Sequence, residues 1–267
     1  MNTGLCKWIV SGWLTVATLA VLAGGSARSV DAYVLPPEQI VRFMTANFST
    51  IRSLEITQTV LVRRPSSERS EQMIEERIWL KAPASYGAEL VGIRNPAVLG
   101  GQESPANGNE ESPSSPAPPL TMERENVHAV FRRFLMANGV ESILDLLGRL
   151  GIPTESVGWE RMDGRVAYRI GTMNPGGPRF LVEKDRFLPL LLRYAIPDEG
   201  EPAMLTVRFE AYQKHGDGWY PHEIIFSSST GTMEIYRITQ IQVNVPVQAP
   251  LVEITAAPLP ASTWFRR

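Results

Sequence analysis

The carboxyl-terminal half of the chain consists of short strand patterns that follow one another with only turns between them. The patterns at 157–162 and 165–171 flank Asp163-Gly164, a strong β-hairpin signal. Further strand patterns occur at 179–184, 187–196, 204–213, 219–228 and 232–245. Parallel neighbours would need a crossover of a dozen or more residues between them, and no regular strand–helix alternation is present. This half of the chain therefore predicts an antiparallel sheet.

The amino-terminal half begins with a helix and continues with three strands. Apolar residues recur at helical spacing from Ile40 to Phe48, directly after Pro36 and Pro37, which suit a helix start. The period then changes to two, and strands are expected at 54–63, 72–81 and 86–93. Three sequential strands this close predict antiparallel pairing.

Two further helices are expected in the middle of the chain. In 121–137 the apolar residues fall at i, i+3, i+4, i+7 and i+8: Val127, Val130, Phe131, Phe134 and Leu135. Arg132 and Arg133 lie near the end of this helix, where cations interact favourably with the helix dipole. A shorter helix is expected at 140–150, ending before Gly151. About ten strands and three helices predict an α+β fold.

Residues 1–32 have the layout of a secretory signal peptide. Lys7 precedes an uncharged run of 16 residues, 8–23, and small residues follow at 24–32. A membrane helix needs about 20 apolar residues, so a permanent anchor is the weaker alternative. We expect cleavage before Tyr33. The only cysteine, Cys6, would be removed, leaving a mature chain without disulfides.

The mature chain, 33–267, is expected to form a single domain with one insert. Residues 100–119 contain no aromatic or β-branched residue and are rich in Gly, Pro, Ser, Asn and Glu, which predicts a disordered surface loop. A boundary between two domains is the alternative, but the part before it would make a poor core. The formal net charge of −2 argues against nucleic acid as a partner.

Motifs for catalysis or metal binding are absent from the sequence. The three histidines, His128, His215 and His222, have no partner at the short fixed spacing of metal ligands. No serine lies in a Gly-x-Ser-x-Gly elbow. We therefore expect no cofactor, no metal and no enzymatic activity.

Glu75 and Glu76 form the one carboxylate pair of interest. Adjacent strand residues point to opposite faces of a sheet, so the two cannot act together as acid and base. Glu76 shares its face with Ile74 and Ile78. We expect Glu76 either to lie at the rim of the sheet or to pair with a basic residue.

Four segments, in this order, resemble the periplasmic lipoprotein carriers of the LolA-like superfamily. They read Ile-Thr-Gln at 56–58, Ile-Trp-Leu-Lys-Ala-Pro at 78–83, Phe-Leu-Pro at 187–189 and Trp-Tyr-Pro-His-Glu-Ile at 219–224. The carriers read aromatic-Thr-Gln and Leu-Trp-x-Lys-Arg-Pro in the first two. The resemblance extends roughly from Pro36 to Val252, interrupted by the insert.

The resemblance implies an unclosed, mostly antiparallel β-barrel, or half-barrel, whose concave face is covered by helices around an apolar cavity. It implies a monomeric periplasmic protein that carries lipoprotein or lipid cargo, with envelope membrane proteins as donor or acceptor. The candidate cavity residues are Ile40, Phe43, Met44, Phe48, Val130, Phe131, Phe134, Ile143, Leu144 and Leu147. Two alternatives stay open: a solidly packed interior, and a non-enzymatic sensor or protein-interaction domain on the same scaffold.

Ala82 departs from the family pattern. The carriers have an arginine at this position, and in them it holds the covering helices shut through hydrogen bonds to backbone carbonyls. Alanine has no donor to replace those bonds. We therefore expect the cover of this protein to be held by apolar contacts alone.

Overall fold

The computed structural model describes most of one compact unit, Val34–Arg267. The expectations for a signal peptide at 1–32 and for an insert at 100–119 lie outside the described residues. These are 34–63, 71–83, 85–94, 130–136, 138–196, 203–229, 231–247, 249 and 251–253.

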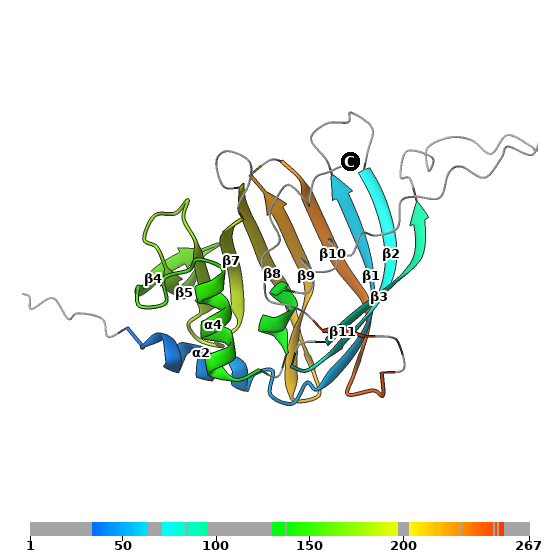
Figure 1. Cartoon of the computed structure of the whole chain (residues 1–267), viewed down its shortest axis with the longest axis horizontal. Helices are drawn as coiled ribbons and strands as arrows, with labels where there is room; N and C mark the ends of the chain where they lie inside the picture. Colours follow the sequence, from blue (N-terminus) through cyan, green and yellow to red (C-terminus); the bar gives the residue numbers. More distant parts are fainter. Residues whose placement is uncertain are drawn as a thin grey trace, which may run out of the picture. The chain divides into compact units, whose positions relative to one another are not determined.

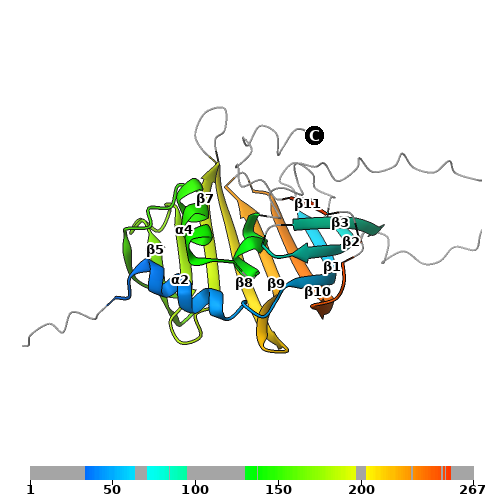
Figure 2. The same ribbon diagram turned by 60° about the horizontal axis from the view of Figure 1, so that its bottom comes forward.

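Eleven strands form a single antiparallel sheet that is not closed into a barrel. Their order is β11-β3-β2-β1-β10-β9-β8-β7-β6-β5-β4, so β11 and β4 are the two edges. Figures 1 and 2 show the sheet curving around the helices. The strands are β1 (Ser53–Arg63), β2 (Glu71–Lys81), β3 (Ser85–Arg94), β4 (Val157–Met162), β5 (Arg165–Gly171), β6 (Arg179–Glu183), β7 (Pro189–Ile196), β8 (Ala203–His215), β9 (Gly218–Ser228), β10 (Met233–Val243) and β11 (Val252–Glu253).

Burial alternates along the strands because one face of the sheet is covered by helices. In β1, Leu54, Ile56 and Val60 are buried, whereas Glu55 and Thr57 between them are only partly so. The same alternation runs along β8. A period of two matches the pleat, which points successive side chains to opposite faces. The face with the larger apolar side chains is the concave one.

Two helices of ten residues each cover the concave face, α2 (Pro37–Ala46) and α4 (Val140–Arg149). Pro37 occupies the first turn of α2, where its missing N–H is not needed. After α4, Gly151 adopts a left-handed conformation with φ of 72°, and the Ile152 N–H donates to the Leu147 carbonyl at 3.0 Å. This is a glycine helix stop of the expected kind.

A third helical segment lies between β3 and α4. Residues 130–132 are α-helical and continue as a 3₁₀ turn, η2 (Arg133–Leu135). The rest of the helix predicted at 121–137 lies outside the described residues. On the part of the chain that the structure describes, no helix is long and apolar enough to cross a membrane.

The predicted fold class is confirmed: the structure is an α+β, unclosed antiparallel half-barrel with helices on its concave face. The predicted strand bounds agree to within about two residues at most ends. The two-residue strand β11 was not predicted; it forms because Val252 and Glu253 return to pair with Tyr86 and Ser85 at the edge of β3.

Candidate functional site

The predicted cavity residues mostly come together between the concave face and its helical cover. Eight of them belong to one buried apolar cluster, at 5% exposure or less, and Leu144 packs against it partly buried. The eight are Ile40, Met44, Phe48, Val130, Phe131, Phe134, Ile143 and Leu147. Whether these side chains contact a ligand stays a prediction.

Phe43 lies at the rim of this cluster instead. It is 42% exposed, and its ring centroid lies 4.8 Å from that of Phe187. Phe187 in turn stacks on Tyr168 at 5.6 Å, and Tyr168 contacts Trp159 at 4.3 Å. A row of four aromatic rings therefore leads from the exposed side of α2 to the sheet edge at β4.

The interior contains side chains packed ring against ring. Phe131 lies 6.3 Å from Phe209 and 6.2 Å from Tyr236, and Phe134 lies 5.0 Å from Phe180. Contacts of this kind add to the apolar area that the rings bury. The cover thus fits closely onto the sheet in this conformation.

One cation lies inside this apolar interior. Arg132 is fully buried, and its Nη1 donates to the Tyr220 hydroxyl at 3.0 Å while its Nη2 donates to Gln58 Oε1 at 3.1 Å. Its guanidinium carbon also lies over the rings of Phe131, at 5.3 Å, and Tyr236, at 5.7 Å. An arginine from the cover therefore reaches the sheet.

The charge of Arg132 is balanced through the sheet. Gln58 of β1 lies directly opposite Glu76 of β2, and its amide nitrogen donates to the Glu76 carboxylate. Both side chains are buried, Glu76 at 5% exposure. One predicted alternative was that Glu76 pairs with a basic residue. The structure comes close to this, because Gln58 links Glu76 to Arg132 by hydrogen bonds.

Electrostatics keep Arg132 cationic. Burial acts to lower the pKa of Arg132, but Tyr220, Tyr86 and Glu76 act to raise it, and the net pKa is raised. Burial raises the pKa of Tyr220, although Arg132 opposes this. The Arg132 guanidinium is therefore a permanent positive charge with hydrogen-bond partners. Burying such a charge in an apolar interior costs far less free energy than burying a charge without partners.

The expectation that apolar contacts alone hold the cover is wrong. The Ala82 side chain has no donor, as expected, but Arg132 donates from the cover to Tyr220 and Gln58 of the sheet. In an ideal helix Arg132 would flank the apolar stripe. The tightening into η2 directly after Arg132 accompanies its turn toward the sheet.

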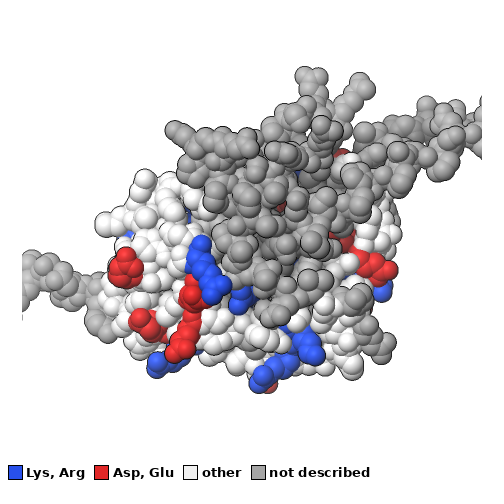
Figure 3. Space-filling model, viewed as in Figure 1, with Lys and Arg blue, Asp and Glu red and all other residues white. Residues whose placement is uncertain are grey.

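A separate pocket of about 630 Å³ lies on the convex face of the sheet. Glu55, Arg77, Trp79 and Glu89 line it together with the segment after β10. None of the predicted cavity residues lines it. Figure 3 shows that acidic and basic side chains are intermixed on the visible described surface, without a large field of one sign.

His215 and His222 lie together although the sequence spacing did not indicate it. Their Nε2 atoms are 2.9 Å apart, across the β8–β9 hairpin, with ring planes at 7°. Among the residues that the structure describes, no group of three or more His, Cys, Asp or Glu side chains could hold a metal ion.

The geometry defines a class of protein, an antiparallel half-barrel with a helix-covered concave face. The sequence matches no protein-family model and no curated protein. Among solved structures, the chain is similar to a LolA superfamily protein from Nitrosomonas europaea, with a TM-score of 0.48 and 13% identity over 80% of this chain and 96% of that one.

Two further solved structures are similar to the chain. One is an outer membrane lipoprotein-sorting protein domain from Vibrio parahaemolyticus, with a TM-score of 0.45 and 12% identity over 79% of this chain and 93% of that one. The other is a DUF1329 family protein from Desulfovibrio piger, with a TM-score of 0.44 and 11% identity over the same shares, 79% and 93%. These likenesses are ones of fold.

Proposed function

We propose that this chain is an exported periplasmic protein that holds an acylated or lipid molecule between the concave face of its sheet and the helices that cover it. It would carry lipoprotein or lipid cargo between envelope membrane proteins that act as donor and acceptor. It would catalyse no reaction.

The construction of the cover supports this proposal. The sheet is continuous by strand pairing from β11 to β4, and the helices take no part in that pairing. The cover consists of short separate pieces, α2, the segment 130–135 and α4. These pieces can move away from the sheet without breaking any strand pairing, and an acyl chain can then replace their apolar side chains against the concave face.

Lipid extraction tests the proposal directly. Protein purified from an envelope fraction is extracted with organic solvent and the extract is analysed by mass spectrometry. The delipidated protein is then titrated with a fluorescent fatty acid. We expect a stoichiometric lipid in the extract and saturable binding of the probe.

Two leucines provide a matched pair of variants. Leu147 and Leu181 are both buried, at 0% and 1% exposure, but Leu147 belongs to the cluster under the cover and Leu181 to a small cluster on the convex face. Either Leu→Ala change costs about 2–5 kcal/mol of stability. Only Leu147→Ala should change the affinity for the probe. Equal probe affinities, or no lipid and no probe binding, would contradict the proposal.

A protein-interaction or sensor domain is the second candidate, and one observation favours it. Leu90, Val91 and Ile93 of β3 are 40–50% exposed, close to the sheet edge. Exposed apolar groups of this kind often mark protein contacts. Absence of lipid together with a closely packed interior would favour this second function.

A further inference from the structure

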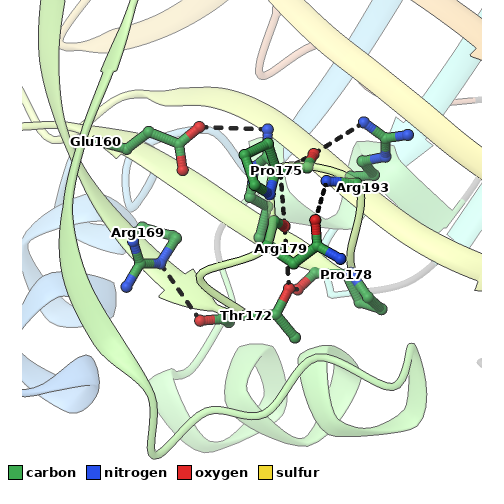
Figure 4. A network of polar contacts seen from close by, with 10 residues as sticks. Glu160, Arg169, Thr172, Pro175, Pro178, Arg179 and Arg193 are labelled. Atoms are coloured by element: carbon green, nitrogen blue, oxygen red, sulfur yellow. Dashed lines mark hydrogen bonds and ion pairs between the residues drawn. The ribbon is translucent and has the colours of Figure 1, made fainter.

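Three arginines gather on the face of the sheet that the helices do not cover. Arg169 of β5, Arg179 of β6 and Arg193 of β7 alternate along their strands with Ile170, Phe180 and Leu192, which belong to the cluster under the cover. Because successive strand residues point to opposite faces, the arginines lie on the convex face. Figure 4 shows them around the turn that joins β5 to β6.

Arg179 and Arg193 are directly opposite each other on neighbouring strands. Like charges in this position repel each other and destabilise a sheet. Arg169 and Arg179 are also largely buried, each at 7% exposure, so solvent screens them poorly. Burial lowers the pKa of Arg179, Glu160 opposes this, and Arg193 and Arg169 lower it further. The three positive charges of this cluster therefore destabilise one another.

The available negative charge does not match these arginines. Among the residues that the structure describes, Glu160 is the one carboxylate paired with the cluster, at 3.2 Å from Arg179 Nη2. Three further carboxylates, on β6, on β8 and in the turn between β4 and β5, have other partners: Glu183 pairs with Arg186 at 2.8 Å, and Asp163 and Glu210 pair with Arg208 at 2.6 Å each. Within the described part of the chain, three cations against one carboxylate leave an excess of two positive charges.

Donors of Arg179 and Arg193 converge on one acceptor, whereas Arg169 Nε donates to the Gly171 carbonyl at 3.4 Å. The Nη1 atoms of Arg179 and Arg193 both donate to the Pro175 carbonyl, the latter at 3.1 Å (Figure 4). The Nε atoms of both arginines are buried without a hydrogen-bond partner in the described part of the chain. A neutral carbonyl shared by two guanidinium groups is a weak acceptor compared with an anion, which forms charge-assisted bonds roughly twice as strong.

We propose that Arg169, Arg179 and Arg193 form a binding site for a phosphate group on the convex face of the sheet. The guanidinium fork matches phosphate oxygens geometrically, which is why arginine is the usual residue for this recognition. The phosphate is either a free inorganic or small-molecule phosphate, or that of a lipid headgroup. The site lies on the face opposite the proposed cargo, so either proposal can fail without the other.

Thermal unfolding with inorganic phosphate tests the site. The sodium phosphate titration is matched in ionic strength with sodium chloride, because general screening would otherwise contribute. A ligand that binds only the folded state raises Tm, and saturating phosphate should raise it by roughly 5 °C or more. Calorimetric titration gives the dissociation constant.

Two variants of equal charge change separate this site from general electrostatics. Arg193→Gln removes a cluster arginine that is only partly buried, and Arg208→Gln removes an arginine of the adjacent strand β8 that is already paired with carboxylates. We expect Arg193→Gln to lose at least about tenfold in phosphate affinity and Arg208→Gln to bind as wild type. Without phosphate, Arg193→Gln should keep its Tm or raise it, because it relieves the repulsion from Arg179. A merely structural arginine would lower Tm in both conditions.

Vesicles distinguish the two sources of phosphate. Phosphatidylcholine vesicles with and without phosphatidic acid are floated with wild-type and Arg193→Gln protein. Binding that requires both phosphatidic acid and Arg193, without an effect of inorganic phosphate, assigns the site to a lipid headgroup. Arg193-dependent binding of inorganic phosphate assigns it to a free phosphate. No response to either, or an equal response in Arg193→Gln, overturns the proposal.

Discussion

Arg132 Nη2 donates to Gln58 Oε1 across 3.1 Å, and neither side chain is exposed to solvent. This bond joins the helical cover to β1. Because Gln58 also donates to Glu76, the bond connects a buried cation to a buried carboxylate through one amide. The cover is therefore held against the sheet by these buried hydrogen bonds as well as by apolar packing.

The first prediction concerns the hydrogen bonds that link Arg132, Gln58 and Glu76. Arg132→Met keeps most of the side-chain volume but leaves Glu76 and Gln58 without their cation. Breaking a buried charge pair from one side typically costs about 3–5 kcal/mol, and we expect the free energy of unfolding to fall by that amount in urea titrations. The double variant Arg132→Met with Glu76→Met removes both charges and should be more stable than the sum of the single losses by about 1 kcal/mol or more.

Arg133→Met is the control for this cycle. Arg133 is adjacent in sequence but half-buried, and its side chain makes a single hydrogen bond, to Ser142 at 3.3 Å, among the described residues. Its loss should cost no more than about 1 kcal/mol. Strict additivity of the Arg132 and Glu76 changes would mean that the two charges do not interact.

The second prediction separates a filled core from a cargo cavity. Phe131→Ala and Phe134→Ala each remove a ring that is at most 1% exposed and packed against other rings. A packed phenylalanine changed to alanine costs about 3–5 kcal/mol. If the rings also line the cargo site, affinity for a fluorescent fatty acid should change by tenfold or more, roughly 1.4 kcal/mol.

Phe43→Ala serves as the comparison for these two variants. Its ring is 42% exposed, so its removal should cost well below the loss at Phe131. A large stability loss in the Phe131 and Phe134 variants with unaltered probe affinity would favour a filled core. It would also remove these two side chains from the proposed cargo site.

Periodicity and turn signals predicted the type and the bounds of most strands and helices. The hairpin at Asp163-Gly164 has the bounds that its turn signal indicates, and α4 begins at Val140 as predicted. Such features depend on neighbouring residues. The pairing of β1 with β10 joins segments about 180 residues apart, and no local signal in either strand specifies it. The LolA-like resemblance supplied the open barrel that local patterns could not.

The sequence indicated only some of the buried polar residues of the interior. Gln58 and Glu76 are polar residues on apolar strand faces, which is a recognisable signal for a buried partner. Arg132 carried no such signal, because a cation beside an apolar stripe is usually solvent-exposed. Likewise, His215 and His222 meet only because the hairpin brings strands β8 and β9 side by side.

The third prediction concerns this histidine pair. The ring centroids are 5.1 Å apart, the ring planes differ by 7° and the two Nε2 atoms lie 2.9 Å apart, within hydrogen-bond distance. Burial lowers the pKa of His215, and burial and His215 lower that of His222. The unfolded state, with an ordinary pKa of about 6.5, then binds more protons than the folded state in mildly acidic solution.

The sign of the pH effect follows from linkage. The contribution of the histidine pair to the free energy of unfolding is complete above the unfolded-state pKa of about 6.5. It is lost as the pH falls through the lowered pKa values of the folded state. We expect the urea midpoint to decrease between pH 7.5 and 5.5. The variant His215→Gln with His222→Gln should reduce this slope. An identical slope in the variant would show that other groups cause the dependence.

The fourth prediction concerns the turn that positions the aromatic row. Phe187 has a φ of 52°, a left-handed conformation that a bulky residue adopts only when its surroundings enforce it. Asn47, at the end of α2, donates from Nδ2 to the carbonyls of Arg186, at 2.8 Å, and Phe187, at 3.2 Å. The Phe187 ring then lies between Phe43 and Tyr168. Asn47 thus holds both the backbone and, through it, the ring.

Replacing Asn47 should loosen this contact between α2 and the sheet. Asn47→Ala is expected to lower the free energy of unfolding by about 1–2 kcal/mol, since the Arg186 and Phe187 carbonyls lose their donor. Asn47→Asp should lose at least as much, because an ionised carboxylate has no donor and faces these same carbonyl oxygens. Ser49→Ala is the nearby control: its hydroxyl makes one exposed bond to the Ala46 carbonyl at 2.9 Å, and its loss should cost about 0.5 kcal/mol or less. Urea titration measures all three, and an Asn47→Asp variant as stable as wild type would show that the amide donors do not hold the turn.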